Sequence, residues 1–232
     1  MQRLCGVALV GGIYEHILPL AIGTGCNGKT VLCETVRCVL GEYGMAAPQG
    51  LLMVKRFQGH STETADLFRK RLVIVSETND DSRLNEGLVK SLTGGEAIRA
   101  RRMREDNWEF NPTHTLLLVT NHRPIVKGRD VGIWRRLRLI PFNAQIVAEQ
   151  QDAHLAEKLR AEYPAILAWM VRGSLDWQQG GLQEPQEVLV ATDQYKAEQD
   201  VLGGFIDDCC LVGAEFRVKS AMGFPPLTDP VF

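Results

Sequence analysis

Residues 17–40, with the sequence ILPLAIGTGCNGKTVLCETVRCVL, decide the fold of this chain. The apolar run at residues 17–22 predicts a buried strand, and the segment after Thr30 has apolar residues at helical spacing. Between them lies a glycine-rich turn, followed by a lysine and a threonine: Gly23, Thr24, Gly25, Cys26, Asn27, Gly28, Lys29 and Thr30. A strand, a Gly-x4-Gly-Lys-Thr turn and a helix together predict a phosphate-binding loop, or P-loop.

The residue types of this loop have a chemical reason. Glycines allow backbone N–H groups to turn inward around phosphate oxygens at the N-terminus of a helix. In such loops the lysine, here Lys29, reaches the β- and γ-phosphates, and the following hydroxyl, here Thr30, ligates Mg²⁺. We therefore expect ATP and Mg²⁺ as ligands. The alternative is an ordinary glycine turn that matches by chance, and the strand and helix patterns on either side argue against it.

The composition limits the architecture and indicates a charged partner. With 232 residues and 45% apolar content, the chain allows one large domain with an appendage, or two small domains. No apolar run approaches the length of a membrane span, and the six cysteines lack metal-binding spacing, which favours reduced thiols in a cytosolic protein. The net charge is −2, yet residues 97–138 hold ten Lys/Arg against four Asp/Glu, whereas residues 143–200 hold four against ten. This asymmetry indicates a local anionic partner.

Two further apolar runs predict buried parallel strands with polar tips. Residues 71–77, RLVIVSE, end at Glu77, and in P-loop NTPases an acid at such a tip holds Mg²⁺ and polarises the attacking water. A strand that ends in a solvated glutamate is the alternative, and Asp80 and Asp81 are interpreted as turn and cap residues. Residues 115–121 end at Asn121, whose amide can orient a water or contact the γ-phosphate.

A basic hairpin is predicted between these two strands. Residues 97–104 and 108–110 form two extended arms around a polar turn. The first arm carries four arginines, Arg99, Arg101, Arg102 and Arg104, whose charge suits a phosphodiester backbone. The alternative is a solvated, charged edge strand.

The remaining patterns predict ordinary elements. We expect a turn at residues 41–44, a short strand at 51–54, helices at 63–70 and 84–92, and a fourth strand that leads to Phe142. Further helices are expected at 150–161, 163–177 and 186–202.

Five blocks in one order, GTGCNGKT, RLVIVSETND, LNEGLVKSLTGGEAIRARR, LLLVTNHRP and GIWRRLRLIPF, resemble the helicase domain of phage and plasmid primase–helicases, a branch of superfamily 3. The resemblance implies an α/β P-loop NTPase of the AAA+ type. Its expected architecture is a three-layer sandwich around a mainly parallel sheet, with an inserted β-hairpin and a C-terminal helical region. It also implies an ATP-dependent motor that moves on single-stranded DNA as a ring of identical chains, usually a hexamer.

The resemblance assigns roles residue by residue. Gly28, Lys29 and Thr30 match the Walker A motif, Glu77 the Walker B acid and Asn121 the sensor of motif C. Lys90 and the turn at 93–95 fall in the block that leads into the DNA-contacting hairpin. Arg135 or Arg136 matches the finger that reaches the ATP of a neighbouring subunit.

Domain limits, partners and alternatives follow from the same resemblance. We expect an ATPase core at residues 1–145, a helical region at 146–210 and an irregular tail at 211–232, with a truncated winged-helix module as an alternative for the tail. A primase domain or replication proteins are the further partners, in a phage- or plasmid-encoded protein of the bacterial cytoplasm. Asn79 stands where the family usually has a carboxylate. A truncated remnant that binds nucleotide or DNA without turnover is therefore an alternative, and a small-molecule kinase, which needs neither the hairpin nor Asn121, fits less well.

Overall fold

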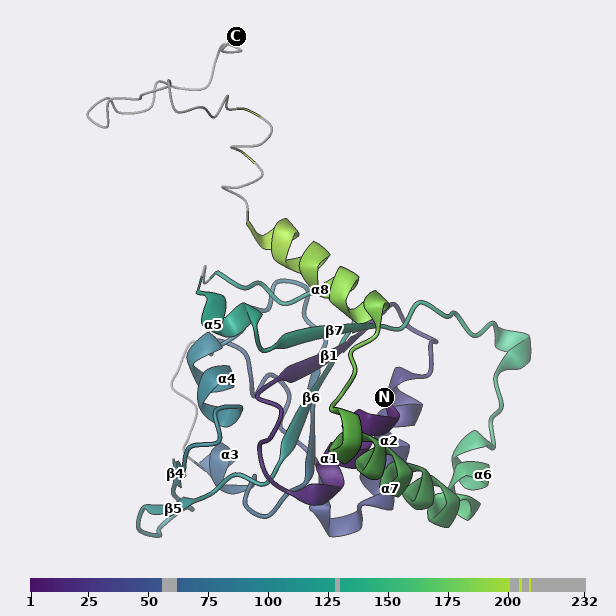
Figure 1. Cartoon of the computed structure of the whole chain (residues 1–232), viewed down its shortest axis with the longest axis horizontal. Helices are drawn as coiled ribbons and strands as arrows, with labels where there is room; N and C mark the ends of the chain where they lie inside the picture. Colours follow the sequence, from purple (N-terminus) through teal and green to yellow (C-terminus); the bar gives the residue numbers. More distant parts are fainter. Residues whose placement is uncertain (56–61, 128–129, 201–204, 206–208, 210–232) are drawn as a thin grey trace.

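The computed structural model describes residues 1–55, 62–127, 130–200, 205 and 209. At its centre is a five-stranded sheet with the order β2-β3-β6-β1-β7, in which all pairs of neighbouring strands are parallel (Figure 1). The strands are β1 (Leu18–Ile22), β2 (Gly44–Ala46), β3 (Leu72–Glu77), β6 (Thr115–Thr120) and β7 (Leu137–Pro141). The predicted α/β fold with a mainly parallel sheet is confirmed.

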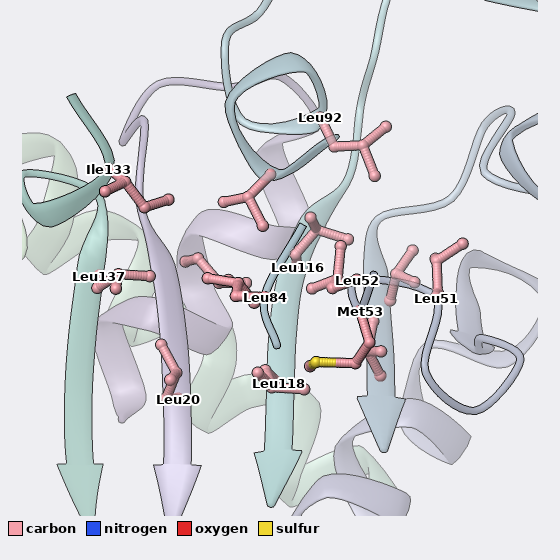
Figure 2. Packing of buried hydrophobic residues seen from close by; sticks show 14 of the residues in the cluster. Leu20, Leu51, Leu52, Met53, Leu84, Leu92, Leu116, Leu118, Ile133 and Leu137 are labelled. Atoms are coloured by element: carbon pink, nitrogen blue, oxygen red, sulfur yellow. The ribbon is translucent and has the colours of Figure 1, made fainter. Parts of the chain in front are cut away.

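Helices cover both faces of the sheet, which explains why its strands are apolar throughout. One face packs against α4 (Glu86–Leu92), α5 (Val131–Trp134) and α8 (Gln186–Gln199). Figure 2 shows Leu20, Leu118 and Leu137 pointing from three strands into this main core. The other face packs against α1 (Gln2–Val10), α2 (Lys29–Val39) and α7 (Tyr163–Gly180).

The last described helix, α8, belongs to the core of the sheet. Its buried residues Val188, Ala191, Thr192 and Tyr195 recur at helical spacing and form one face. The Thr192 hydroxyl accepts a hydrogen bond from the backbone N–H of Leu139 in β7 at 2.9 Å. The Tyr195 hydroxyl donates to the Pro124 carbonyl in the loop after β6. Helix α8 is thereby tied both to the edge strand and to that loop.

The predicted hairpin is confirmed. Strands β4 (Ile98–Ala100) and β5 (Trp108–Phe110) pair antiparallel and lie in Figure 1 on the side of the molecule away from α6 (Leu155–Ala161) and α7. Its inner face joins the main core, and the Phe68 ring lies 4.8 Å from Trp108 and 5.5 Å from Phe110, measured between ring centroids. This aromatic contact fixes the hairpin to the body.

The strand predicted at residues 51–54 is wrong. Residues 51–54 form turns with a single bridge between Met53 and Leu84, and the outer strand is β2, which begins at the end of the predicted turn. Leu51 and Leu52 are apolar because they fill the main core (Figure 2), and a short apolar run does not distinguish burial from a strand.

Several helix limits also differ. The helix expected at 63–70 is a four-residue α3 (Thr62–Ala65), and α6 begins later than expected, after a 3₁₀ turn at Ala148–Gln150. A second 3₁₀ turn, Gly41–Tyr43, precedes β2. The predicted tail at 211–232 lies outside the described residues. Among the helices that the structure describes, none is long and apolar enough to span a lipid bilayer.

Buried His114 gives the fold a predicted pH dependence. Its side chain is 2% exposed, its Nε2 lies 3.2 Å from the Leu92 carbonyl, and its Nδ1 has no hydrogen-bond partner among the described residues. Burial lowers the pKa of His114 from 6.5 to about 4. As pH falls from about 6.5 to about 4, the unfolded chain takes up a proton that the folded chain does not, so the free energy of unfolding falls by up to about 3 kcal/mol.

Urea unfolding between about pH 7 and about pH 4.5 tests this expectation against a His114→Gln variant, which does not titrate there. Wild type should lose more stability on acidification than the variant. Equal losses in the two proteins would show that His114 does not stay neutral in the fold.

Candidate functional site

Three parallel strands bring the predicted polar residues to one edge of the sheet. The register places Ile22, Thr120 and Glu77 side by side, at the carboxyl ends of β1, β6 and β3. Because β6 lies between β1 and β3, Glu77 is two strands, or roughly 10 Å, from the end of β1. In open α/β sheets, ligands bind outside this edge.

The glycine loop, residues 23–28, connects β1 to α2 and requires glycine at two positions. Gly28 has φ +80 and forms the N-cap of α2, and a Cβ on Gly23 would lie 2.3 Å from the Phe142 carbonyl oxygen. The segment after β7 holds the loop, because the N–H of Ile146 donates to the Cys26 carbonyl at 2.7 Å. The turn is therefore a defined structure packed against the end of β7.

Lys29 lies beneath this loop with a buried ammonium. Its side chain donates to the Gly23 carbonyl at 2.6 Å, to Asn27 Oδ1 at 3.1 Å and to Asn121 Oδ1 at 3.2 Å. The residue is 4% exposed, and burial lowers the pKa of its ammonium. In the part of the chain that the structure describes, no carboxylate forms an ion pair with it. A buried cation held by neutral oxygens is suited to an anionic ligand.

Asn27 links the loop to Lys29, a role that the sequence pattern did not indicate. Its amide nitrogen donates to the carbonyls of Thr24 and Phe142, and its oxygen accepts from the Lys29 ammonium. The other loop residues are more open, and Thr30 is exposed at the first turn of α2. The Thr30 hydroxyl is thus accessible to a ligand at this edge.

Glu77 ends β3, as predicted, and its carboxylate is fixed. One oxygen accepts the backbone N–H groups of Thr78 and Asn79 at 2.8 and 2.9 Å. The other lies next to Gly50, where an added Cβ would approach it to 3.3 Å. The residue is 3% exposed, so neighbouring backbone restricts both oxygens. Gly50 was not singled out from the sequence, because its proximity arises only in the folded chain.

The loops after β3 and β6 are joined by a side-chain contact between His122 and Asp80, next to Asn121. His122 Nε2 lies 2.7 Å from Asp80 Oδ1, so Asp80 does more than end a turn. Thr120 Oγ1 donates to the His122 carbonyl at 2.8 Å, which fixes the backbone on either side of Asn121. A groove of about 800 Å³ extends from Gly23 past Asn121 to α8. The edge is therefore both ordered and open to a ligand.

The two finger candidates lie at the opposite edge of the sheet. Arg135 and Arg136 precede β7, whose first residue, Leu137, is level with Leu18 at the start of β1. Five strand residues, roughly 16 Å, separate this amino edge from the glycine loop. Arg135 is exposed, whereas Arg136 is 9% exposed and donates to the Gly132 carbonyl at 2.6 Å. Neither side chain is brought to the Lys29 site of its own chain.

The predicted DNA-contacting residues divide into two groups. Lys90 forms an ion pair with Asp130 at the start of α5. The hairpin arginines, Arg99, Arg101, Arg102 and Arg104, are exposed, and none of them forms an ion pair within the described ranges. Arg99 lies opposite Glu109 in the register, and the other three lie in the turn beyond β4. The turn of the hairpin therefore presents three arginines to solvent, beside the exposed acids Glu105 and Asp106.

Comparison with known proteins relates this architecture to viral replication proteins. The family model described as "Family of unknown function (DUF5906)" matches residues 21–136, half of the chain. "Putative helicase L207/L206" of Acanthamoeba polyphaga mimivirus is 28% identical over 88% of this chain and 23% of its own length. "Putative helicase 022R" of Frog virus 3 is 26% identical over 89% of this chain and 23% of its own.

A third relative and a solved structure agree with these matches. "Putative primase C962R" of African swine fever virus (isolate Warthog/Namibia/Wart80/1980) is 31% identical over 56% of this chain and 14% of its own length. The apo A form of the NrS-1 C-terminal region (305–718) matches 90% of this chain and 49% of that chain, with a TM-score of 0.58 and 12% identity, which supports the fold alone. The chain spans about a quarter of the length of the viral helicases that it matches. It belongs to the family DUF5906 and, with these relatives, to the primase–helicases.

Proposed function

We propose that this chain is the ATP-driven motor of a replicative DNA helicase, a superfamily 3 ATPase of the AAA+ P-loop type. One observation supports this more than any other. The Lys29 ammonium is buried beneath a glycine loop and donates to the Gly23 carbonyl and to Asn121 Oδ1, at the edge of the sheet where β3 ends in Glu77. Lysine, amide and carboxylate at one edge suit the hydrolysis of a nucleoside triphosphate.

The residues present fit ATP and Mg²⁺. The loop amides and Lys29 would hold the phosphates, and Thr30 and Glu77 would hold the cation. When bound, Mg²⁺ supplies positive charge that neutralises the phosphate oxygens. Glu77 would accept a hydrogen bond from the attacking water, and Asn121 would orient that water or the terminal phosphate.

The position of Arg135 favours a ring, and the proposed assembly is a hexamer. An exposed arginine at the amino edge cannot serve the carboxyl edge of its own chain, but it can extend to the nucleotide of a neighbour. We propose that the protein moves along single-stranded DNA, which the hairpin binds. A primase domain and replication proteins are the proposed partners. We place this activity in the cytoplasm of the host cell, and an origin in a phage or plasmid stays a prediction.

Phosphate release tests the proposed function. It should be measured at rising protein concentration with ATP and Mg²⁺, with and without single-stranded DNA, and with Lys29→Ala as the inactive control. We expect turnover to rise more steeply than protein concentration, because active sites form between subunits. We also expect single-stranded DNA to stimulate turnover. ATP binding without any turnover would instead support the alternative, a nucleotide- and DNA-binding protein without catalysis. Asn79, which stands where the family usually has a carboxylate, is the reason for this alternative.

The hairpin tip should determine DNA affinity. A variant with Arg101, Arg102 and Arg104 changed to alanine should bind single-stranded DNA about tenfold to a hundredfold more weakly. Its dependence of log affinity on log salt should be less steep by about two, since each lost phosphate contact removes about 0.7. Titration of labelled oligonucleotide at several salt concentrations measures both quantities.

The matched control removes the same number of positive charges away from the hairpin, by changing the exposed residues Arg160, Arg172 and Lys196 of α6, α7 and α8 to alanine. It should leave affinity and salt slope near wild type. Equal losses in this control and in the hairpin variant would show that the effect is one of net charge and not of the hairpin.

A further inference from the structure

The C-terminal end of α4 is a junction of three distant segments. His16, just before β1, places Nδ1 2.9 Å from the Thr93 carbonyl oxygen. His114, just before β6, places Nε2 3.2 Å from the Leu92 carbonyl oxygen. Arg136, just before β7, donates from Nε to the Thr93 hydroxyl at 3.2 Å. We call Leu92, Thr93 and these three side chains the α4 junction.

Within this junction, Arg136 is a buried charge without a carboxylate partner. Its side chain is 9% exposed, and in the described ranges no aspartate or glutamate forms an ion pair with it. Its hydrogen-bond acceptors are the Thr93 hydroxyl and the Gly132 carbonyl, both neutral. The negative end of the α4 dipole favours the guanidinium in part. An apolar side chain of similar volume at this position would stabilise the fold equally well. Stability alone therefore does not account for an arginine here.

The two acceptors of Arg136 belong to two functional elements. Thr93 is followed by Gly94 and Gly95, which lead into β4 of the DNA-contacting hairpin. Gly132 lies within α5, whose C-cap is Arg135, the exposed candidate for the finger. One rigid, planar side chain therefore joins the root of the hairpin to the helix that carries the finger.

We propose that Arg136 is a positioning residue that couples the hairpin to Arg135, so that DNA held at the hairpin alters how Arg135 meets the neighbouring nucleotide. This inference rests on the proposed function, because it assumes that the hairpin binds DNA and that Arg135 contacts ATP. It separates the two adjacent arginines: Arg135 contacts the reacting phosphates of the next subunit, and Arg136 acts through Arg135 and Thr93. Packed side chains and hydrogen bonds can carry coupling between two sites, and the α4 junction forms such a connection between the hairpin and α5.

The test uses Thr93, because its hydroxyl can be removed with little change in volume. Thr93→Val loses the acceptor for Arg136 together with the hydroxyl's own bond to the Val89 carbonyl, and Thr93→Ser retains both. Both variants should bind DNA like wild type and keep most of the DNA-free phosphate release. In Thr93→Val the stimulation of phosphate release by DNA should fall by about threefold to tenfold, a size usual for residues that couple two sites, and Thr93→Ser should restore it. Unchanged stimulation in a folded Thr93→Val protein overturns the proposal.

A second readout is independent of catalysis. Amide hydrogen exchange should become faster in β4, β5 and α5 together in Thr93→Val, relative to Thr93→Ser, while β1 and β6 stay protected. If wild type shows no DNA-stimulated turnover, the proposed function fails, and exchange still decides the coupling. If exchange becomes faster in the hairpin but not in α5, or in neither of the two, the proposal is overturned even when wild type shows no DNA-stimulated turnover.

Discussion

Replacing Glu77 by glutamine should lower phosphate release by about a hundredfold to ten-thousandfold, the size usual for a positioned base, and leave ATP affinity within a few-fold of wild type. The amide keeps the shape of the side chain but loses the charge that polarises the attacking water. The backbone N–H groups of Thr78 and Asn79, which donate to one carboxylate oxygen, can still bind the amide oxygen. The measurement is single-turnover phosphate release beside a nucleotide-binding titration.

A matched control excludes a general loss of negative charge. Glu162→Gln removes an exposed carboxylate at the N-cap of α7 and should retain wild-type turnover. If Glu77→Gln turns over at the wild-type rate, Glu77 is a structural residue at the end of β3. Another carboxylate would then have to polarise the attacking water.

Replacing Arg135 by alanine should lower phosphate release by about a thousandfold or more, the contribution usual for an arginine supplied in trans. ATP and DNA binding should persist, because Arg135 lies at the amino edge, away from the Lys29 site, and is not part of the hairpin. Turnover at saturating ATP and DNA, with protein above the concentration needed for assembly, measures the loss.

Mixing variants tests the trans arrangement directly. Arg135→Ala subunits keep an intact loop, and Lys29→Ala subunits keep an intact arginine. Where the two meet in one ring, a complete site forms, so the mixture should recover part of the activity that both lack alone. No recovery at any ratio, with assembly verified by mass, contradicts a role for Arg135 in the site of a neighbour.

Local patterns were sufficient to predict the parts of the site. The loop around Lys29, the strand that ends at Glu77, the strand that Asn121 follows, and the hairpin all lie where their sequence patterns indicated. Each pattern is short in sequence, and each has a physical cause within a few residues. The glycine turn needs particular backbone angles, the strands need burial on both faces, and the hairpin needs a polar turn.

Contacts between distant segments were not predictable from those patterns. The contact between Asp80 and His122, and the approach of Gly50 to Glu77, depend on which strands become neighbours. The same holds for the arginines before β7, which are adjacent in sequence. Burial of Arg136 against Thr93 distinguishes it from Arg135, and that packing arises only in the folded chain.

A structure of this protein with Mg²⁺ and a non-hydrolysable ATP analogue tests the central claim most directly. We predict that the Lys29 ammonium exchanges its contact with the Gly23 carbonyl for phosphate oxygens, with Thr30 and Glu77 next to the cation and Asn121 within hydrogen-bond reach of the terminal phosphate. A nucleotide bound elsewhere, with Lys29 still held by Gly23 and Asn27, would contradict it.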